Sequence, residues 1–208
     1  ATGGVCVSES KPYTFKVLPP VVAAIATITP GDKVCAPAQI TFTNASSNAT
    51  RNEWTFEVGT SSSILQSGSN ITYTYTNPSD VPKTVNVLLQ AFNERNCKAE
   101  ATAQITVYPE PRPENSFKIT DKCNPLKLEF LSNSPSLSTY EWIFTPTGVA
   151  AASGTQVIQT GTQTNPPTPV EVQLTNSSPH DFVDYQIAYK GSKDWGGGIV
   201  CAAGPIAV

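Results

Sequence analysis

Short runs of alternating apolar and polar residues cover most of the chain, and Gly, Pro, Asn and Ser separate these runs. In residues 53–58, for example, Trp54 and Phe56 fall on one face and the polar residues fall on the other. A period of two residues predicts half-buried β-strands, and no segment shows the helical period. Short strands divided by turn residues predict an all-β protein built from two-sheet sandwiches of about seven strands each.

The same pattern occurs twice. Glu53-Trp54-Thr55-Phe56 corresponds to Glu141-Trp142-Ile143-Phe144, and each tryptophan lies 19 residues after the cysteine of a Cys-x-Pro sequence, Cys35 or Cys123. Shared features at one fixed spacing indicate two copies of one module. Large apolar residues that alternate inward are expected between the two sheets of a sandwich. The predicted core residues are Trp54, Phe56, Trp142 and Phe144.

Prolines and the repeat together predict the domain boundaries. Residues 1–20 are interpreted as the C-terminal strand of a preceding module, 21–109 as a complete sandwich and 114–208 as a second one. Alternating prolines in 110–113 predict a stiff, extended linker, which would place the two modules in a rod.

The second module is longer than the first. Its tryptophan and last cysteine are 59 residues apart, against 43 in the first module, and we place the additional residues in an insert at about 176–198. The alternating segment 170–174 is aligned with 85–89, because both read Val-x-Val-x-Leu.

Charge and hydropathy exclude two classes of partner. Only 14 % of the residues are charged, the formal net charge is −3, and there is no run of Lys and Arg, so nucleic acid is not an expected partner. The longest apolar stretch, 17–28, contains two prolines and is too short to cross a bilayer, so no membrane insertion is expected. The chain shows no signal peptide and contains no Met, and it is interpreted as a piece of a longer protein.

Five cysteines in a β chain rich in Thr and Asn indicate disulfides and an oxidising, extracellular compartment. Zinc is the competing interpretation, but it requires closely spaced pairs such as C-x₂-C, which the sequence lacks. We predict Cys35–Cys97 and Cys123–Cys201, each joining the opening of the second strand of a module to the opening of its last strand. Cys6 is predicted to be unpaired, because its partner would lie in the preceding module.

The Cys-x-Pro and Glu-Trp-x-Phe sequences, with Tyr73-Thr-Tyr-Thr-Asn-Pro78 and Asn96-Cys97, resemble PKD (polycystic kidney disease-type) domains. The resemblance is strongest to the cysteine-bearing kind repeated in large gliding-motility adhesins on the surface of Bacteroidetes. It implies immunoglobulin-like sandwiches used as extracellular spacer or adhesive repeats, exported by type IX secretion, with neighbouring repeats as partners. The acidic turn of the family's Trp-x-Phe-Gly-Asp-Gly is missing after both Trp54 and Trp142, so no calcium site or other cofactor is assigned.

Candidate ligand-binding residues lie in the predicted insert. Trp195 follows Asp194 and precedes three glycines, with no alternation around it. A flat indole face binds sugars, and a nearby carboxylate accepts hydrogen bonds from their hydroxyl groups. Tyr189 is the third candidate, and surface polysaccharide or another surface protein is the candidate ligand. The alternative interpretation is that Trp195 caps the edge of the sandwich.

No arrangement of residues predicts catalysis. Asp181 and Asp184 could contact a hard cation, but two carboxylates without further oxygen ligands do not define a metal site. His180 as a general base would need a nucleophile in a recognisable setting, and no G-x-S-x-G is present. The chain is therefore predicted not to be an enzyme. Three hypotheses remain: a rigid spacer in an adhesin, a binding module, and an accessory piece of a secreted hydrolase.

Overall fold

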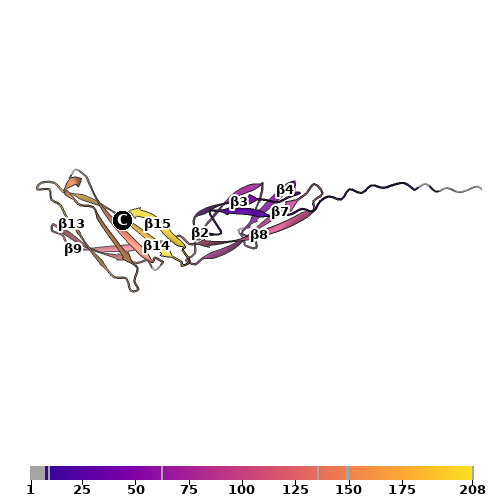
Figure 1. The fold of residues 1–208 in the computed structure, drawn as a ribbon. Helices are drawn as coiled ribbons and strands as arrows, with labels where there is room; N and C mark the ends of the chain where they lie inside the picture. Colours follow the sequence, from indigo (N-terminus) through magenta and orange to yellow (C-terminus); the bar gives the residue numbers. More distant parts are fainter. Residues whose placement is uncertain (1–7, 9, 62, 135, 149, 208) are drawn as a thin grey trace, which may run out of the picture.

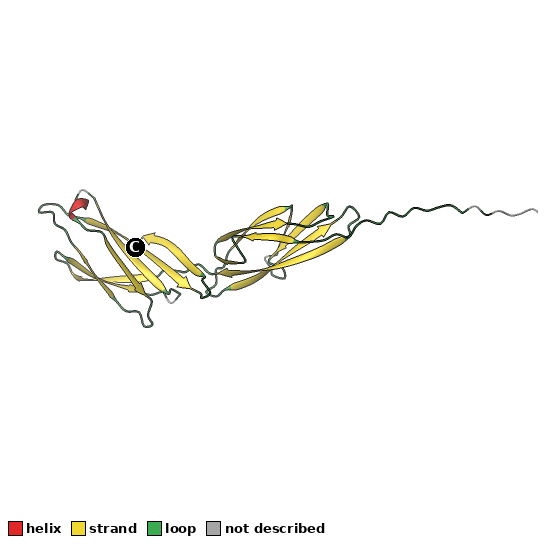
Figure 2. Ribbon diagram, viewed as in Figure 1, coloured by secondary structure: helices red, strands yellow, loops and turns green. Residues whose placement is uncertain are grey.

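The computed structural model describes residues 8, 10–61, 63–134, 136–148 and 150–207. Figure 1 shows two β-sandwiches placed end to end, with an extended N-terminal arm leaving the first of them. Figure 2 shows that strands make up both sandwiches. Among the described residues, Ala151–Ser153 form a short 3₁₀ turn. The prediction of an all-β fold with two-sheet sandwiches is confirmed.

The first module consists of a three-stranded and a five-stranded sheet. The smaller sheet has the order β1-β3-β6, with β1 (Ile25–Thr29), β3 (Ala38–Asn44) and β6 (Asn70–Tyr75). The larger sheet has the order β2-β8-β7-β4-β5, with β2 (Lys33–Cys35), β4 (Arg51–Phe56), β5 (Ile64–Ser67), β7 (Lys83–Phe92) and β8 (Lys98–Tyr108). β2 runs parallel to the last residues of β8 and pairs Cys35 with Tyr108.

The core of the first module lies between these sheets. Alternation in β3 and β4 buries Ile40, Phe42, Trp54 and Phe56 completely. Trp54 donates a hydrogen bond from Nε1 to the carbonyl oxygen of Gly68, 3.1 Å away, so the polar atom of the buried indole is paired.

The second module repeats the architecture. One sheet has the order β13-β10-β9, with β9 (Asn115–Asp121), β10 (Leu126–Ser132) and β13 (Val170–Leu174). The other has the order β12-β11-β14-β15, with β11 (Thr139–Thr147), β12 (Val157–Thr162), β14 (Asp184–Asp194) and β15 (Val200–Ala207). Phe130, Trp142, Phe144 and Tyr189 are completely buried between these sheets.

Strand pairing shows how the two modules correspond. In the first module Trp54 of β4 lies opposite Leu89 of β7, and in the second Trp142 of β11 lies opposite Tyr189 of β14. β14 is therefore the counterpart of β7, and it is a central strand of its sheet. The prediction of an insert at 176–198 is wrong for the residues that form β14.

The alignment of 170–174 with 85–89 is also wrong. β13 pairs with β10, as β6 pairs with β3, so residues 170–174 correspond to β6. Part of the additional length lies in β11 and β12, which have nine and six residues against six and four in β4 and β5. The Val-x-Val-x-Leu alternation shows which face of a strand is buried but does not show which strand it pairs with.

The N-terminal arm makes no strand between residue 10 and residue 20. Its Tyr13 and Phe15 are 79 % and 86 % exposed, so no sheet of the described chain covers them. The arm meets the first module near residue 20, where the side-chain amide of Asn48 donates a hydrogen bond to the carbonyl oxygen of Pro20 at 2.8 Å. Cys6 lies outside the described residues.

Candidate functional site: the junction between the two modules

A disulfide joins the two modules where they meet. Cys35 ends β2 beside the last residue of β8, and Cys201 lies at the start of β15. Their sulfur atoms are bonded, their Cα atoms are 5.5 Å apart, and 166 positions separate them in the sequence. This Cα separation lies within the range that disulfide geometry allows. The bridge is therefore a covalent link between modules, in addition to the linker.

The predicted pairs Cys35–Cys97 and Cys123–Cys201 are wrong, and strand length explains why. Cys97 precedes the first residue of β8, whereas Cys35 pairs with its last residue, Tyr108. The eleven residues of β8 span about 35 Å at roughly 3.3 Å per residue, far beyond the reach of a disulfide. β9 likewise leads from the junction toward Cys123, whereas Cys201 lies at the junction. Cys97 and Cys123 are free and exposed.

Two aromatic rings from different modules pack beside the disulfide. Tyr108, at the end of β8, and Trp195, in the turn from β14 to β15, have ring centroids 5.6 Å apart. The ammonium of Lys193 lies 5.5 Å from the centroid of the indole ring, a distance at which a cation is attracted to the ring face. Trp195 thus packs across the junction between the modules, whereas the alternative interpretation from the sequence was that it caps the edge of the sandwich.

The glycines after Trp195 make its turn possible. Gly196, Gly197 and Gly198 have φ values of +79°, +60° and +82°, which residues other than glycine rarely adopt. The turn is closed by the amide of Trp195, which donates a hydrogen bond to the carbonyl oxygen of Ile199 at 2.9 Å. Asp194 supports it, because its Oδ1 accepts a hydrogen bond from the amide of Gly196 at 2.8 Å.

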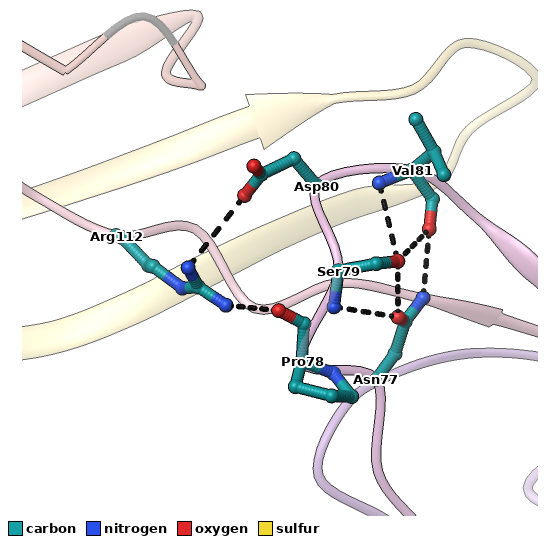
Figure 3. A network of polar contacts seen from close by, with 6 residues as sticks. All are labelled: Asn77, Pro78, Ser79, Asp80, Val81 and Arg112. Carbon is teal, nitrogen blue, oxygen red and sulfur yellow. Dashed lines mark hydrogen bonds and ion pairs between the residues drawn. The ribbon is translucent and has the colours of Figure 1, made fainter.

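The linker is held against the first module. Pro109 and Pro111 are buried. Arg112 donates a hydrogen bond to the carbonyl oxygen of Pro78 and lies 3.8 Å from the carboxylate of Asp80, as Figure 3 shows. Arg112 and Asp80 are exposed, so this ion pair contributes little energy by itself. Together the two contacts connect the linker to the turn between β6 and β7.

Asn77 stabilises the turn that Arg112 contacts. Its buried amide donates hydrogen bonds to the carbonyl oxygens of Val81 at 2.9 Å and Val107 at 2.8 Å. Its Oδ1 accepts hydrogen bonds from the amide and the hydroxyl of Ser79, at 3.1 Å and 2.6 Å (Figure 3). Because Val107 belongs to β8, the β6–β7 turn, the end of β8 and the linker form one connected network.

A cleft of about 400 Å³ lies at this junction. Acidic and basic side chains of both modules and the linker line it together with one indole ring: Asp80, Arg112, Glu114, Ser136, Lys193 and Trp195. Nε1 of Trp195 is buried and has no hydrogen-bond partner among the described residues. The cleft is thus lined by an indole ring and by charges of both signs.

The three predicted ligand-binding residues are not one site. Tyr189 is wrong as a ligand contact, because it is completely buried, stacks on Trp142 at 4.1 Å and shares a hydrogen bond with the hydroxyl of Ser132. Asp194 is exposed, but one of its oxygens is used by the turn. Trp195 is partly exposed at the cleft. Tyr108 and Arg112, which the sequence did not single out, belong to the junction with it.

The other candidate residues lie away from the junction. His180 and Asp181 are in the exposed connection before β14, and Asp184 is its exposed first residue. Within the described ranges, no group of three or more His, Cys, Asp and Glu residues is arranged to hold a metal ion.

Comparisons with known proteins do not assign the chain to a family. No protein-family model and no curated protein matches it. Among solved structures, one match is described as "Structural basis for the promiscuous specificity of the carbohydrate-binding modules from the beta-sandwich super family". It is 13 % identical, has a TM-score of 0.38, and covers 93 % of this chain and 100 % of that chain. At this similarity it carries no argument about function, which must come from the junction itself.

Proposed function

We propose that this chain is a non-catalytic extracellular spacer, in which two sandwiches are locked in series to hold a fixed distance and to carry tension. The observation that carries the proposal is the Cys35–Cys201 disulfide between modules. A bridge within a module would stabilise that module alone. A bridge between modules restricts their relative motion, which is what a spacer requires.

The contacts around the bridge support the same role. The linker, the Tyr108–Trp195 contact and the disulfide are separate connections between the two sandwiches. Relative motion is the default for modules joined by a flexible linker. Each additional contact at the junction restricts that motion. We therefore expect the junction to hold the two modules in one orientation.

The setting of the spacer is a further part of the proposal. Disulfides persist in oxidising environments, which supports a secreted or cell-surface location. In the described part of the chain, no helix has the length and hydropathy of a membrane span. The resemblance of the cysteine and tryptophan spacing to PKD-type repeats supports a parent protein of the gliding-adhesin kind, exported by type IX secretion, with neighbouring repeats as partners.

Single-molecule energy transfer between the outer ends of the two modules tests the spacer. Dyes would be attached through non-natural residues at Arg95 and Lys122, which are exposed and lie beside Cys97 and Cys123. We expect one narrow distribution of transfer efficiency, which broadens when Cys35→Ser removes the bridge. Cys97→Ser is the matched control and should leave the distribution narrow. A distribution that is equally broad with and without the bridge would contradict a rigid spacer.

A second candidate function is ligand binding in the junction cleft, by a polysaccharide or a protein. It is favoured by the lining of the cleft, which places acidic and basic side chains beside the indole ring of Trp195. Titration with a panel of bacterial and algal polysaccharides, followed by tryptophan fluorescence, tests it. Binding should be lost in Trp195→Ala, which removes the indole ring from the lining of the cleft. Absence of saturable binding to any member of the panel would count against a polysaccharide ligand.

A further inference from the structure

We propose that Cys97 and Cys123 form the same kind of intermodule disulfide with further copies of this module. Cys123 would bond to the cysteine that opens the last strand of a following copy. Cys97 would bond to the Cys-x-Pro cysteine of a preceding copy. This inference rests on the proposed spacer function and deepens it, because the intermodule disulfide seen once in the structure would then recur along an array of modules.

The four described cysteines belong to two kinds. Cys35 and Cys123 each begin a Cys-x-Pro sequence 19 residues before the core tryptophan, between the first strand of a module and the strand that pairs with it. We call them exit cysteines. Cys97 and Cys201 lie at the start of the last strand, β8 or β15, and we call them entry cysteines. Each module therefore carries one cysteine of each kind.

The bond in the structure joins an exit cysteine to an entry cysteine. It uses Cys35 of the first module and Cys201 of the second. The two cysteines left over are the entry cysteine of the first module and the exit cysteine of the second, and both are free and exposed. Because equivalent residues of the same repeat are bonded at the junction, the free cysteines are interpreted as halves of the same connection.

The positions of the free cysteines agree with this assignment. Cys97 is separated from the junction by the whole of β8, and Cys123 by the whole of β9, which have eleven and seven residues. At roughly 3.3 Å per residue, these strands place the two thiols about 35 Å and 23 Å from the junction, at the outer ends of the pair. They are thus where a preceding and a following module would meet this chain.

The N-terminal arm already repeats part of the junction. Tyr108, the last residue of β8, packs on Trp195 in the turn before β15. Leu18 and Pro19 of the arm share a hollow with Asn93 and Glu94, which lie in the turn before β8. In both places the chain entering a module passes over the turn that precedes the last strand of that module. At both entry ends, the incoming chain thus lies near the turn that precedes the last strand.

The chemistry of the bond is an ordinary thiol–disulfide exchange. The thiolate of one cysteine attacks a small-molecule disulfide such as oxidised glutathione, which releases one reduced glutathione and leaves a mixed disulfide. The second thiolate then attacks the protein sulfur, forms the intermodule bond and releases a second reduced glutathione. Two protein thiols lose two protons and two electrons, and one oxidised glutathione accepts them.

The two kinds of cysteine predict a directional link. An exit cysteine bonded to an entry cysteine is a head-to-tail contact, which makes an open chain rather than a closed dimer. Two exit cysteines, or two entry cysteines, have no reason to pair. This rule separates the proposal from random oxidation of exposed thiols, which would join them without preference.

Mixing two single-thiol variants tests the rule. Both carry Cys6→Ser, one also carries Cys97→Ser and keeps Cys123, and the other carries Cys123→Ser and keeps Cys97. They are combined at about 1 mM, near the effective concentration of linked neighbours, in a buffer of oxidised and reduced glutathione. Non-reducing electrophoresis measures the dimers, and peptide mapping identifies the bond. We expect the amount of the mixed dimer, bonded Cys123–Cys97, to be about ten times that of either homodimer. Random pairing would give about twice the amount of either homodimer.

Three outcomes would overturn the inference: dimers in the random ratio, no dimers, or a Cys6–Cys97 bond in the unmodified chain. Energy transfer between the outer ends is measured on the same monomers, through dyes at Arg95 and Lys122. A narrow distribution without mixed dimers would leave the two-module spacer standing and remove only its extension to further copies. A broad distribution would count against the spacer itself.

Discussion

Tension across the ends of this chain is expected to bypass most of both modules while the Cys35–Cys201 disulfide is intact. Force that enters before Cys35 crosses the sulfur–sulfur bond and leaves along β15 after Cys201. The residues between the two cysteines lie inside a covalent loop. They cannot lengthen the molecule, even if they unfold, because the loop is closed by a bond that the applied tension does not break.

The size of the effect follows from the length of the loop. The bonded cysteines are 166 positions apart, while their Cα atoms are separated by 5.5 Å in the folded protein. A fully extended chain spans roughly 3.3–3.6 Å per residue, so opening the bridge releases about 550–600 Å of additional length. With the bridge closed, only the segments outside the loop can extend.

Optical-tweezers measurements on chains held by handles at both termini would detect this difference directly. We expect the oxidised protein to show no unfolding step from residues inside the loop, and Cys35→Ser to show steps that sum to the released length. Cys97→Ser is the matched control, because it removes a cysteine of the first module without opening the bridge, and it should behave as the unmodified protein does. Steps that sum to several hundred ångströms in the oxidised, unmodified protein would refute the reasoning.

Three further predictions concern stability. Cys35→Ser and Cys201→Ser should each lower the free energy of unfolding of both modules by about 4 kcal/mol, because with the bridge closed either module unfolds as a closed loop of roughly 75–90 residues while the other stays folded. Calorimetry should show that the unfolding transitions of both modules move to lower temperature, and a change confined to the module that carries the substitution would contradict this coupling. Asn77→Ala should destabilise the first module by about 2–3 kcal/mol in urea titrations, because it leaves buried groups unpaired. Asn86→Ala, at an exposed position, is the control and should change the stability by less than about 0.5 kcal/mol, and equal effects of the two substitutions would show that the Asn77 network does not stabilise the turn. Burial raises the pKa of Tyr73, Tyr75 and Tyr189, so the stability that these side chains contribute should be complete below the pKa of about 10 of an unfolded tyrosine and should decline as the pH rises above that value. Urea unfolding midpoints of a Cys97→Ser/Cys123→Ser variant, measured across this pH range, test the decline, and midpoints that stay unchanged up to pH 11 would exclude it.

The strands and the core follow from local sequence. Alternation around Trp54 and Trp142 places each indole on the inward face, and both are completely buried. The repeat of Glu-Trp-x-Phe at one fixed distance from Cys-x-Pro indicates two modules of one kind, and both contain the same arrangement of a three-stranded and a larger sheet. These inferences hold because the face of a strand that a residue occupies depends only on its neighbours along the chain.

Only part of the candidate site could be predicted from local sequence. The break in alternation at Trp195 marked a turn, and the three glycines after it do adopt positive φ. Its partner Tyr108 belongs to the other module, and no local pattern connects the two residues. Tyr189 was placed among the ligand contacts because its strand was taken for an insert, although its register opposite Trp142 makes it a core residue.

Sequence alone thus determined the fold class, the repeat and the buried face of the strands around the two core tryptophans, because these depend on short-range periodicity. Only the tertiary structure decided which cysteines meet. Spacing along the chain favoured Cys35 with Cys97, but strand direction puts these residues at opposite ends of β8 and brings Cys35 to Cys201 of the next module. Disulfide formation requires Cα atoms within about 7 Å. That distance is set by how strands run and how modules stack, which the order of residues in one module does not contain.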